Sequence, residues 1–454
     1  MGPSLDSVYL LPFREDHVLF APLHGVTALV SRRAAEDLCT SIPGHRRPKD
    51  KMLRRWMRSF KEEAPSLPSL DFSPLLLGII PTRACNAKCR YCHFESSSAD
   101  QGMMSMAAAV RAVDGFVGQA RETGSRSLKI HFFGGEPMMA PEVVTAVVHR
   151  ARLLAARHGL RTDFEITTNG QFPADWAQFL GDYFQTVVLS LDGQREVQDF
   201  QRPLKTGQGS FEAACRTARI VSESQVELCL RCCVSQRNVA QMPEIAAWFC
   251  REFEPSCINF EVLQPSSTAE SSGLIPPDPV QFATGFLQAR AECERFGVRA
   301  VYAADIAPPQ WSSCPVGKDA LIVCPDGAVA GCYLTPDRGQ RSGLRLEVGR
   351  NDSELSIDRG ALAAIKQIIK DKPRCRRCFC RWSCAGGCHV DNTPVGASPD
   401  YGHTCLQTRI ISMASLLGQL VSSDDLQSFI DDQSALRRLA LRASDRLADY
   451  ELAP

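Results

Sequence analysis

Short apolar runs alternate with amphipathic helical stretches along the middle of the chain. Strand-like runs occur at LLLGII (75–80), LKIHFF (128–133), FEITT (164–168), TVVLSL (186–191), VELCLRCCV (226–234) and INFEVL (258–263). Helical patterns such as MAAAVRAVDGFVGQAR and APEVVTAVVHRARLLAARHG separate them. Because parallel neighbours in a sheet need crossover helices, this repeat predicts an α/β fold, a partial (β/α)6 TIM-like barrel over residues 74–265. In such folds the chemistry lies at the C-terminal ends of the strands.

The patterns on either side of this repeat differ from it. Residues 7–36 predict three short strands and a helix, and MLRRWMRSF (52–60) predicts a second helix. The segment EAPSLPSLDFSP (63–74) is rich in Pro and Ser, which is typical of a linker. The predicted flanking parts are a small N-terminal α+β module over 1–62, a linking helical segment over 266–310, a cysteine-rich domain over 311–410 with a hairpin turn at CPDG (324–327), and helices over 411–454.

Composition and charge narrow the class of protein. The 454 residues include 51 basic and 51 acidic side chains, and this zero net charge argues against a nucleic-acid or anionic-membrane partner. No run approaches the ~20 apolar residues of a spanning helix, and the N-terminus lacks a secretory signal pattern. The 20 cysteines are the outlier. In a long chain without a signal they indicate metal or redox sites, so we expect a cytoplasmic protein with thiolate ligands.

Three cysteines follow the first predicted strand in the stretch CNAKCRYC. Cys85, Cys89 and Cys92 lie on one loop, and three thiolates can hold three irons of a cubane cluster. The fourth iron is then free for another molecule. A structural zinc site is the alternative, but it takes four protein ligands, and apart from adjacent His93 no fourth lies at finger-like spacing.

These residues resemble the signature of radical S-adenosylmethionine (SAM) enzymes. The pattern is CxxxCxxC with an aromatic Tyr91, and it is followed by FFGGEP (132–137), TTNG (167–170) and SLDG (190–193) at successive strand ends. The resemblance covers roughly residues 74–405. It implies that SAM binds the open iron of a 4Fe–4S cluster and is cleaved by one electron to a 5′-deoxyadenosyl radical, which abstracts hydrogen from the substrate.

The resemblance also implies SAM contacts, residue by residue. These are Tyr91 and Leu263 at the adenine, Gly134, Gly135 and Glu136 at the methionine amino group, Ser190 at the ribose or carboxylate, and Arg202 as a further contact. Glycine allows the backbone to approach closely. As alternatives, the GG pair is only a turn and Arg202 a surface ion pair. Arg231 is a weaker candidate for the carboxylate, and Cys229, Cys232 and Cys233 are expected to be packed thiols.

The later cysteines resemble the seven-cysteine SPASM extension of some radical SAM enzymes. By this resemblance Cys314, Cys332 and Cys388 bind one auxiliary 4Fe–4S cluster, and Cys375, Cys378, Cys384 and Cys405 bind a second. Cys324, across a predicted hairpin from Cys332, is one candidate for the missing fourth ligand, and an open iron is the alternative. Cys380 is a spare thiol. The implied cofactors are SAM and three 4Fe–4S clusters, with a pair of zinc ribbons as the alternative.

The SPASM resemblance implies a peptide or protein substrate, and two groups of such enzymes are candidates. Anaerobic sulfatase-maturating enzymes carry an Asp after the Cys of the Gly-x4-Cys element, where this chain has Tyr333. The opening SVYLLPFREDHVLF resembles maturases of His-Xaa-Ser peptide systems. The N-terminal module also resembles winged-helix-like peptide-recognition modules, which add a leader peptide to a strand edge. Its alternative is a cap on the barrel.

The resulting hypothesis is a ribosomal-peptide maturase that forms a C–C, C–O or thioether crosslink. Its expected partners are a precursor peptide and a flavodoxin or ferredoxin as electron donor. The alternatives are sulfatase maturation and a non-enzymatic iron–sulfur or zinc scaffold. No catalytic base is assigned, and Tyr333, Glu261 and Asp319 are the candidates.

Overall fold

The computed structural model describes most of the chain in two compact units. The described residues are 7–41, 48–59, 75–92, 94, 102–305, 307–314, 316, 318–333, 345–370, 373–388 and 402–449. The predicted linker 63–74 lies outside them. We call Leu70–Tyr302 with Pro315–Gln367 the barrel unit, and Met1–Ser69 with Ala303–Cys314 and Ile368–Pro454 the terminal unit. The predicted N-terminal module and the last helices therefore fall into the same unit.

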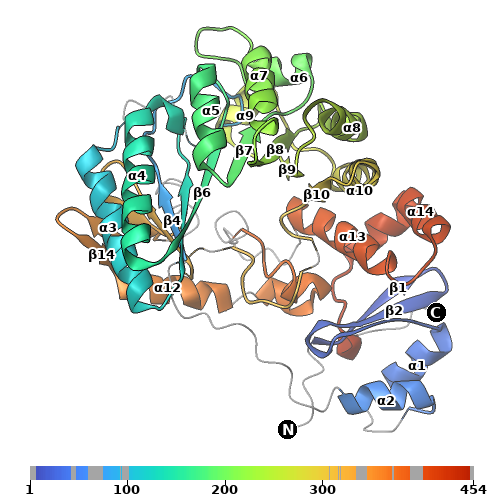
Figure 1. Ribbon diagram of the computed structural model, residues 1–454. Coiled ribbons are helices and arrows are strands. Elements are labelled where there is room, and N and C mark those ends of the chain that lie inside the picture. Colours follow the sequence, from blue (N-terminus) through green and yellow to red (C-terminus); the bar gives the residue numbers. More distant parts are fainter. Residues whose placement is uncertain are drawn as a thin grey trace. The chain divides into compact units, whose positions relative to one another are not determined.

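The barrel unit contains the six predicted strands as parallel neighbours in sequence order (Figure 1). They are β4 (Leu76–Ile79), β5 (Ser127–Phe132), β6 (Arg161–Thr168), β7 (Thr186–Ser190), β8 (Glu227–Val234) and β9 (Cys257–Val262). Their apolar side chains form the core, as at Leu77, Ile130 and Phe164, which are at most 1% exposed. The predicted α/β partial barrel is confirmed.

Within the described ranges, the same sheet continues beyond these six strands to a total of eleven. β10 (Arg299–Val301) runs parallel to β9, and β11 (Ala320–Val323) runs parallel to β4. Three antiparallel strands then follow: β12 (Ala328–Ala330), β13 (Glu347–Asn351) and β14 (Leu355–Ile357). The CPDG turn joins β11 to β12, with Gly327 N–H donating to Cys324 O at 3.0 Å, so the predicted hairpin is confirmed.

Helices connect the parallel strands and cover the sheet. They are α3 (Met106–Glu122), α4 (Pro141–His158), α5 (Ala174–Tyr183), α6 (Arg195–Gln201), α7 (Phe211–Ser222), α8 (Met242–Phe253), α9 (Ser267–Ser271), α10 (Pro279–Arg295) and α12 (Arg359–Lys370). Local signals set their ends: the Ser105 side chain caps α3 by accepting from Ala108 N–H, and α4 starts with Pro141 and stops at Gly159 in the left-handed region (φ 66°). Figure 1 shows α3, α4 and α5 along one side of the strands.

The terminal unit combines an antiparallel sheet with helices from both ends of the chain. Its elements are β1 (Tyr9–Phe13), β2 (Asp16–Ala21), β3 (Val26–Val30), α1 (Arg32–Ser41), α2 (Lys51–Ser59), α13 (His403–Leu417), α14 (Ser423–Asp431) and α15 (Gln433–Leu441). The sheet order is β1-β2-β3. The outer edge of β1 is paired: Leu10 N–H donates to Asp445 O and Leu447 N–H donates to Val8 O, both at 2.9 Å.

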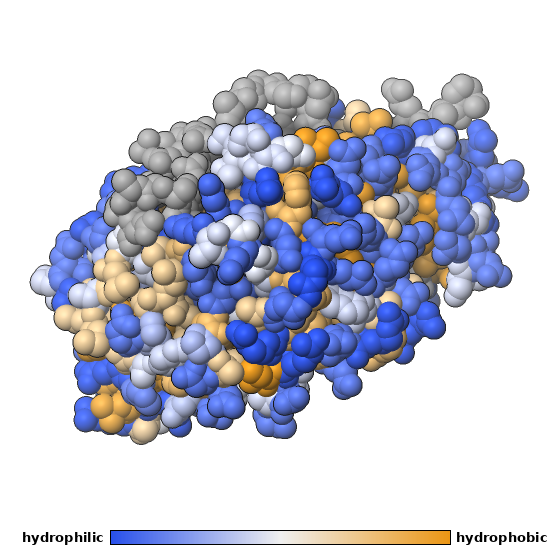
Figure 2. All heavy atoms as spheres, turned by 90° about the horizontal axis from the view of Figure 1, so that it is seen from above, coloured by the Kyte–Doolittle hydropathy of each residue, from blue (hydrophilic) through white to orange (hydrophobic). Residues whose placement is uncertain are grey.

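Figure 2 shows hydrophilic residues over most of the face drawn, with apolar residues in scattered groups. Among the described helices, none is long and apolar enough to cross a membrane.

Candidate active site

A cavity of about 280 Å³ lies in the barrel unit at the C-terminal ends of the parallel strands. Parallel strands bring the segments after β4, β5, β6 and β7 to the same end of the sheet. The lining therefore includes every residue that the resemblance assigned to SAM and its cluster: Cys85, Cys89, Cys92, Tyr91, Gly134, Gly135, Glu136, Ser190, Arg202 and Leu263. Their individual roles stay predictions, but they line the same cavity.

Backbone hydrogen bonds hold the three-cysteine loop to the last residue of α6 and to the segment that follows it. Lys88 N–H donates to Pro203 O at 2.7 Å, and Arg90 N–H donates to Gln201 O at 2.9 Å. Burial raises the pKa of the Cys85 thiol to about 12. Burial also raises the pKa of the Cys89 thiol, to about 11, and the positive charge of Arg202 opposes this rise. The thiols must lose protons to bind metal, so cluster loading is expected to release protons.

The spacing of the thiols bears on which metal they hold. No group of three or more His, Cys, Asp or Glu in the described part of the chain is spaced to hold one metal ion. A structural zinc ion needs its four ligands around a single centre. In a cubane each thiolate binds a different iron, so the three thiols that line this cavity match a cluster whose fourth iron is open.

The GGEP turn packs directly on the three-cysteine loop. Gly135 N–H donates to Thr82 O at 3.1 Å, and Glu136 N–H donates to Ala84 O at 2.8 Å. A Cβ on Gly135 would lie 2.1 Å from Ala84 O and 2.5 Å from Arg83 O. Glycine is therefore required here because the backbone of the three-cysteine loop lies so close. The sequence had suggested a different reason, close approach of the Gly135 backbone to SAM.

Replacing Gly135 by Ala is expected to displace the three-cysteine loop. The clash is with backbone atoms, so no side-chain rotation relieves it. We expect the iron bound per chain after anaerobic reconstitution to fall toward the value of a protein with one cluster fewer. Gly118→Ala on α3 is the matched control, since its Cβ would meet nothing within 4 Å. Full iron content in Gly135→Ala would contradict this account of the turn.

Glu136 ties the GGEP turn to the TTNG segment. Its carboxylate accepts from Thr168 Oγ1 and Asn169 N–H, both at 2.7 Å, and from Met138 N–H at 3.1 Å. Burial raises the pKa of Glu136, and these hydrogen bonds act in the opposite direction. Asn169 in turn donates to Asn86 Oδ1 at 2.8 Å and lies 3.6 Å from Cys85 Sγ. The sequence marked TTNG only as a motif and did not assign Asn169 a contact.

Tyr91, Arg202 and Leu263 form one side of the cavity. Arg202 Nη1 donates to the Tyr91 hydroxyl at 2.6 Å, and the Arg202 side chain is 13% exposed. The surface ion pair considered for Arg202 is therefore wrong, because its acidic partner Asp192 is fully buried. Tyr91 also packs against the apolar cluster that contains Leu263, which suits the predicted adenine contact.

The weaker candidates on β8 lie in different surroundings. Arg231 lines the cavity and lies 4.0 Å from Glu261, which lines it too. Cys233 also lines the cavity, and Cys232 is a buried thiol. Cys229 is not a free thiol as expected: it forms a disulfide with Cys257, its register partner on β9, at a Cα–Cα distance of 4.8 Å. Facing positions on neighbouring strands bring the two sulfurs within bonding reach.

Tyr333 reaches the same cavity from the segment after β12. Its hydroxyl lies 2.7 Å from His131 Nδ1, and His131 Nε2 lies 3.0 Å from Thr167 Oγ1. Gly78 on β4 makes room for it, because a Cβ there would be 2.5 Å from the Tyr333 hydroxyl. Of the three candidate bases, Tyr333 and Glu261 line the cavity. Asp319 precedes β11, pairs with Lys318 at 3.0 Å and is not among the lining residues.

His131 gives the barrel unit a predictable dependence on pH. Burial lowers its pKa from 6.5 to about 4, with Glu165 opposing. The unfolded chain then binds the proton more readily, so stability is complete above pH 6.5 and is lost as pH falls toward 4. We expect the free energy of unfolding to be about 2 kcal/mol lower at pH 5 than at pH 7.5 because of this residue. Urea unfolding of the wild type and His131→Gln at both pH values measures it.

The control for this pH dependence is an exposed histidine at the end of α4. His158→Gln is expected to keep the wild-type loss of stability between pH 7.5 and pH 5, because the side chain is exposed. His131→Gln is expected to reduce that loss. Equal losses in the two variants would contradict the assignment to His131.

Four of the later cysteines line a second, smaller cavity, inside the terminal unit. Cys375, Cys378, Cys384 and Cys405 surround about 30 Å³ together with Cys380 and Arg409. Cys375 lies in the 3-10 turn η5 (Pro373–Arg377), and Cys378 directly precedes the 3-10 turn η6 (Phe379–Trp382). Cys384 follows η6, and Cys405 lies in the first turn of α13. A hydrogen bond from Cys380 lowers the pKa of Cys378, and Arg409 acts in the same direction. The spare thiol of the sequence therefore lies in the same cavity as the four predicted ligands.

The other predicted auxiliary ligands are divided between the units. Cys314 and Cys388 belong to the terminal unit, and Cys332 and Cys324 belong to the barrel unit. Ser313 Oγ donates to Cys384 O at 3.0 Å, which holds the Cys314 segment beside the second cysteine set. Burial raises the pKa of Cys324 to about 11. The first auxiliary set stays a prediction, as does the choice between Cys324 and an open iron.

Comparison with known proteins agrees with this geometry. Residues 79–248 match the family described as the radical SAM superfamily. A serine-type anaerobic sulfatase-maturating enzyme of Klebsiella aerogenes is 25% identical over 333 residues, covering 69% of this chain and 79% of that one. A cysteine-type enzyme of Clostridium perfringens is 28% identical over 182 residues, covering 39% and 48%.

Solved structures share the fold at low identity. Native anSMEcpe with bound AdoMet and the Cp18Cys peptide has a TM-score of 0.62 and 20% identity, covering 76% of this chain and 99% of that one. Streptococcus suis SuiB bound to S-adenosylmethionine has a TM-score of 0.50 and 14% identity, covering 88% and 98%.

The fold, the converging motifs and the matched family define a radical SAM enzyme, which uses SAM and a 4Fe–4S cluster. Within that class, the chain resembles the anaerobic sulfatase-maturating enzymes in sequence and fold, and SuiB in fold.

Proposed function

We propose that this enzyme modifies a side chain of a ribosomally made precursor peptide and forms a C–C, C–O or thioether crosslink. The observation that carries the proposal is the composition of the cavity. Beyond the residues assigned to SAM, its lining includes Phe94, Phe133, Tyr333, Arg231 and Glu261. This second set offers an aromatic wall and an ion pair to a substrate side chain, next to the assigned cluster loop.

Different residues of the chain would bind SAM and exclude water from the reaction. When bound, SAM and the reduced cluster supply a 5′-deoxyadenosyl radical that abstracts hydrogen from carbon. Ser190 and Arg202 would orient SAM through polar groups, and Leu263 would contact its adenine. Phe133 and Tyr333, whose ring centroids are 4.8 Å apart, would keep water away from the reacting carbon.

The auxiliary cysteines are proposed to hold two further 4Fe–4S clusters. For the second set, four thiols line one cavity, beside the buried Arg409. Four thiols are the donor set of a cubane. Their proposed use is to accept the surplus electron or to bind the peptide. A flavodoxin or ferredoxin is the proposed electron donor to the SAM cluster.

The terminal unit is proposed to capture the leader part of the peptide. The outer edge of β1 is already paired with residues 445–447. Within the described residues, β3 pairs only with β2, on its inner side. An extended peptide would therefore add beside β3 (Val26–Val30) through backbone hydrogen bonds.

Sulfatase maturation is the second candidate, and the similarity of sequence to those enzymes favours it. The residue after Cys332 argues against it. The resemblance places an Asp base there, but this chain has Tyr333, whose hydroxyl is hydrogen bonded to His131. A phenol held by an imidazole does not replace a free carboxylate as a base at neutral pH, because burial raises the pKa of Tyr333.

Mass spectrometry with two kinds of peptide separates the candidates. The reconstituted enzyme, SAM and a reductant are incubated without oxygen with short peptides encoded beside the gene, and separately with a sulfatase peptide. A crosslink removes a pair of hydrogen atoms and leaves no aldehyde, whereas formylglycine reacts with a hydrazine reagent. Modification of the sulfatase peptide alone would overturn the crosslinking proposal.

A further inference from the structure

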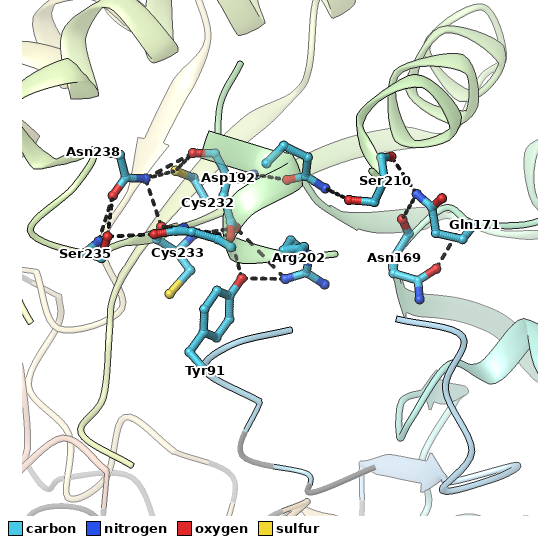
Figure 3. A network of polar contacts seen from close by, with 12 residues as sticks. Tyr91, Asn169, Gln171, Asp192, Arg202, Ser210, Cys232, Cys233, Ser235 and Asn238 are labelled. Atoms are coloured by element: carbon cyan, nitrogen blue, oxygen red, sulfur yellow. Dashed lines mark hydrogen bonds and ion pairs between the residues drawn. The ribbon is translucent and has the colours of Figure 1, made fainter. Parts of the chain in front are cut away.

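We infer that Asp192 is a positioning residue for SAM binding: its buried carboxylate fixes the side chains of Tyr91 and Arg202 (Figure 3). The SLDG motif suggested only Ser190 as a SAM contact, so Asp192 goes beyond the assigned set. The inference rests on the assignment of Tyr91 and Arg202 to SAM. It does not depend on which peptide is modified.

The carboxylate of Asp192 accepts hydrogen bonds on both oxygens. It follows β7 and is 0% exposed. Oδ2 accepts from the Tyr91 hydroxyl at 2.6 Å and from Gln201 Nε2 at 2.9 Å. Oδ1 accepts from Cys233 N–H at 3.0 Å and lies 4.0 Å from Arg202 Nη1. All of these partners are donors, so the position requires a group that only accepts.

The hydrogen bonds run in one direction from Arg202 to Asp192. Arginine has no acceptor, so the Tyr91 oxygen accepts from Arg202 Nη1 at 2.6 Å. The Tyr91 hydrogen is then committed to Asp192. This order fixes both the rotation of the Tyr91 hydroxyl and one end of the guanidinium, and Tyr91 and Arg202 both line the cavity.

Asp192 itself is held by its backbone as well as by its side chain. Its N–H donates to Gln198 Oε1 at 2.8 Å, and its carbonyl accepts from Asn238 Nδ2 at 3.1 Å. Gln201 is fixed in turn, because its Oε1 accepts from Ser235 Oγ at 2.6 Å. The network joins α6 to the ends of β7 and β8, so the position of the carboxylate is set by three elements of the barrel (Figure 3).

The substitution Asp192→Asn keeps the shape of the side chain, but only one of its two ends can then accept hydrogen bonds. Whichever way the amide is turned, its NH2 group faces a donor: Tyr91 and Gln201 on one side, or Cys233 N–H on the other. The charge that balances Arg202 is also lost. Both effects are expected to loosen Tyr91 and Arg202 while leaving the cysteine ligands in place.

The test measures SAM affinity and iron content on the same reconstituted full-length protein. Asp192→Asn is expected to raise the dissociation constant of SAM by about ten- to a hundredfold, the range for loss of a charge-assisted hydrogen bond. Iron per chain is expected to stay at the wild-type value. The electron paramagnetic resonance signal of the reduced cluster should need correspondingly more SAM to shift.

Three further variants distinguish positioning from a general loss of structure. Asp199→Asn on α6 removes a carboxylate that accepts from Phe211 N–H at 2.8 Å and is outside the Tyr91 network, so SAM affinity should not change. Tyr91→Phe should weaken SAM binding, and the double variant Asp192→Asn, Tyr91→Phe should lose less than the product of the two single effects. Unchanged SAM affinity in Asp192→Asn, multiplicative losses, or iron lost in parallel with SAM affinity would overturn the inference.

Discussion

The variant with Cys85, Cys89 and Cys92 all replaced by Ala is expected to form no 5′-deoxyadenosine from SAM. The three thiols line the cavity that also holds the assigned SAM contacts, so their removal takes away the ligands of the cluster that delivers the electron. With three cubanes in the wild type, iron should fall from about twelve to about eight per chain. Anaerobic reconstitution, followed by chromatography of the SAM products and an iron assay, measures both.

A control variant separates loss of the cluster from loss of thiols in general. Cys215 is buried on α7 and does not line the cavity, so Cys215→Ala should keep both the iron and the deoxyadenosine. Deoxyadenosine from the triple variant would refute the assignment of the loop. Zinc without iron in the wild type would instead support the scaffold alternative.

The variant Asp445→Ala is expected to destabilise the terminal unit by about 3–5 kcal/mol, the cost of leaving a buried charge without its partner. Arg409 and Asp445 are both 0% exposed, with Nη1–Oδ2 at 2.6 Å and Nη2–Oδ1 at 3.1 Å. Arg409 Nη1 also lies 3.4 Å from Cys378 Sγ. We therefore expect an earlier urea midpoint together with weaker retention of iron at the second auxiliary set.

An exposed ion pair of the same unit provides the comparison. Arg14 and Asp425 are about half exposed, at 48% and 41%, so Asp425→Ala should shift the urea midpoint far less than Asp445→Ala does. Similar urea midpoints for the two variants would mean that burial of the Arg409 pair does not govern the stability of this unit.

The parallel strands and the convergence of their motifs were predictable from the sequence. Runs such as LKIHFF and TVVLSL have the length of buried strands, and each motif directly follows one of them. The rule that parallel strands end at one edge then brings Cys85, Gly135 and Ser190 together. The prediction that these residues lie together therefore did not require knowledge of side-chain contacts.

The partners of these residues could not be predicted in the same way. Asp192 is hydrogen bonded to Tyr91, 101 positions away along the chain, and His131 to Tyr333, 202 positions away, and no local pattern marks such pairs. Gly135 is constrained by a backbone that only the folded loop brings close. The disulfide Cys229–Cys257 depends on the register of β8 against β9, which the apolar pattern leaves undetermined.

The pairing of β1 with residues 445–447 bears on the order in which the protein folds during synthesis. The strands of the terminal unit leave the ribosome first, but the backbone groups at the edge of β1 meet their partners only after the whole barrel unit has been made. Domains generally fold as they emerge, whereas this sheet must wait with its β1 edge open. An open edge is a template for pairing with other chains, so slow translation or truncation before residue 445 should favour aggregation of the nascent chain.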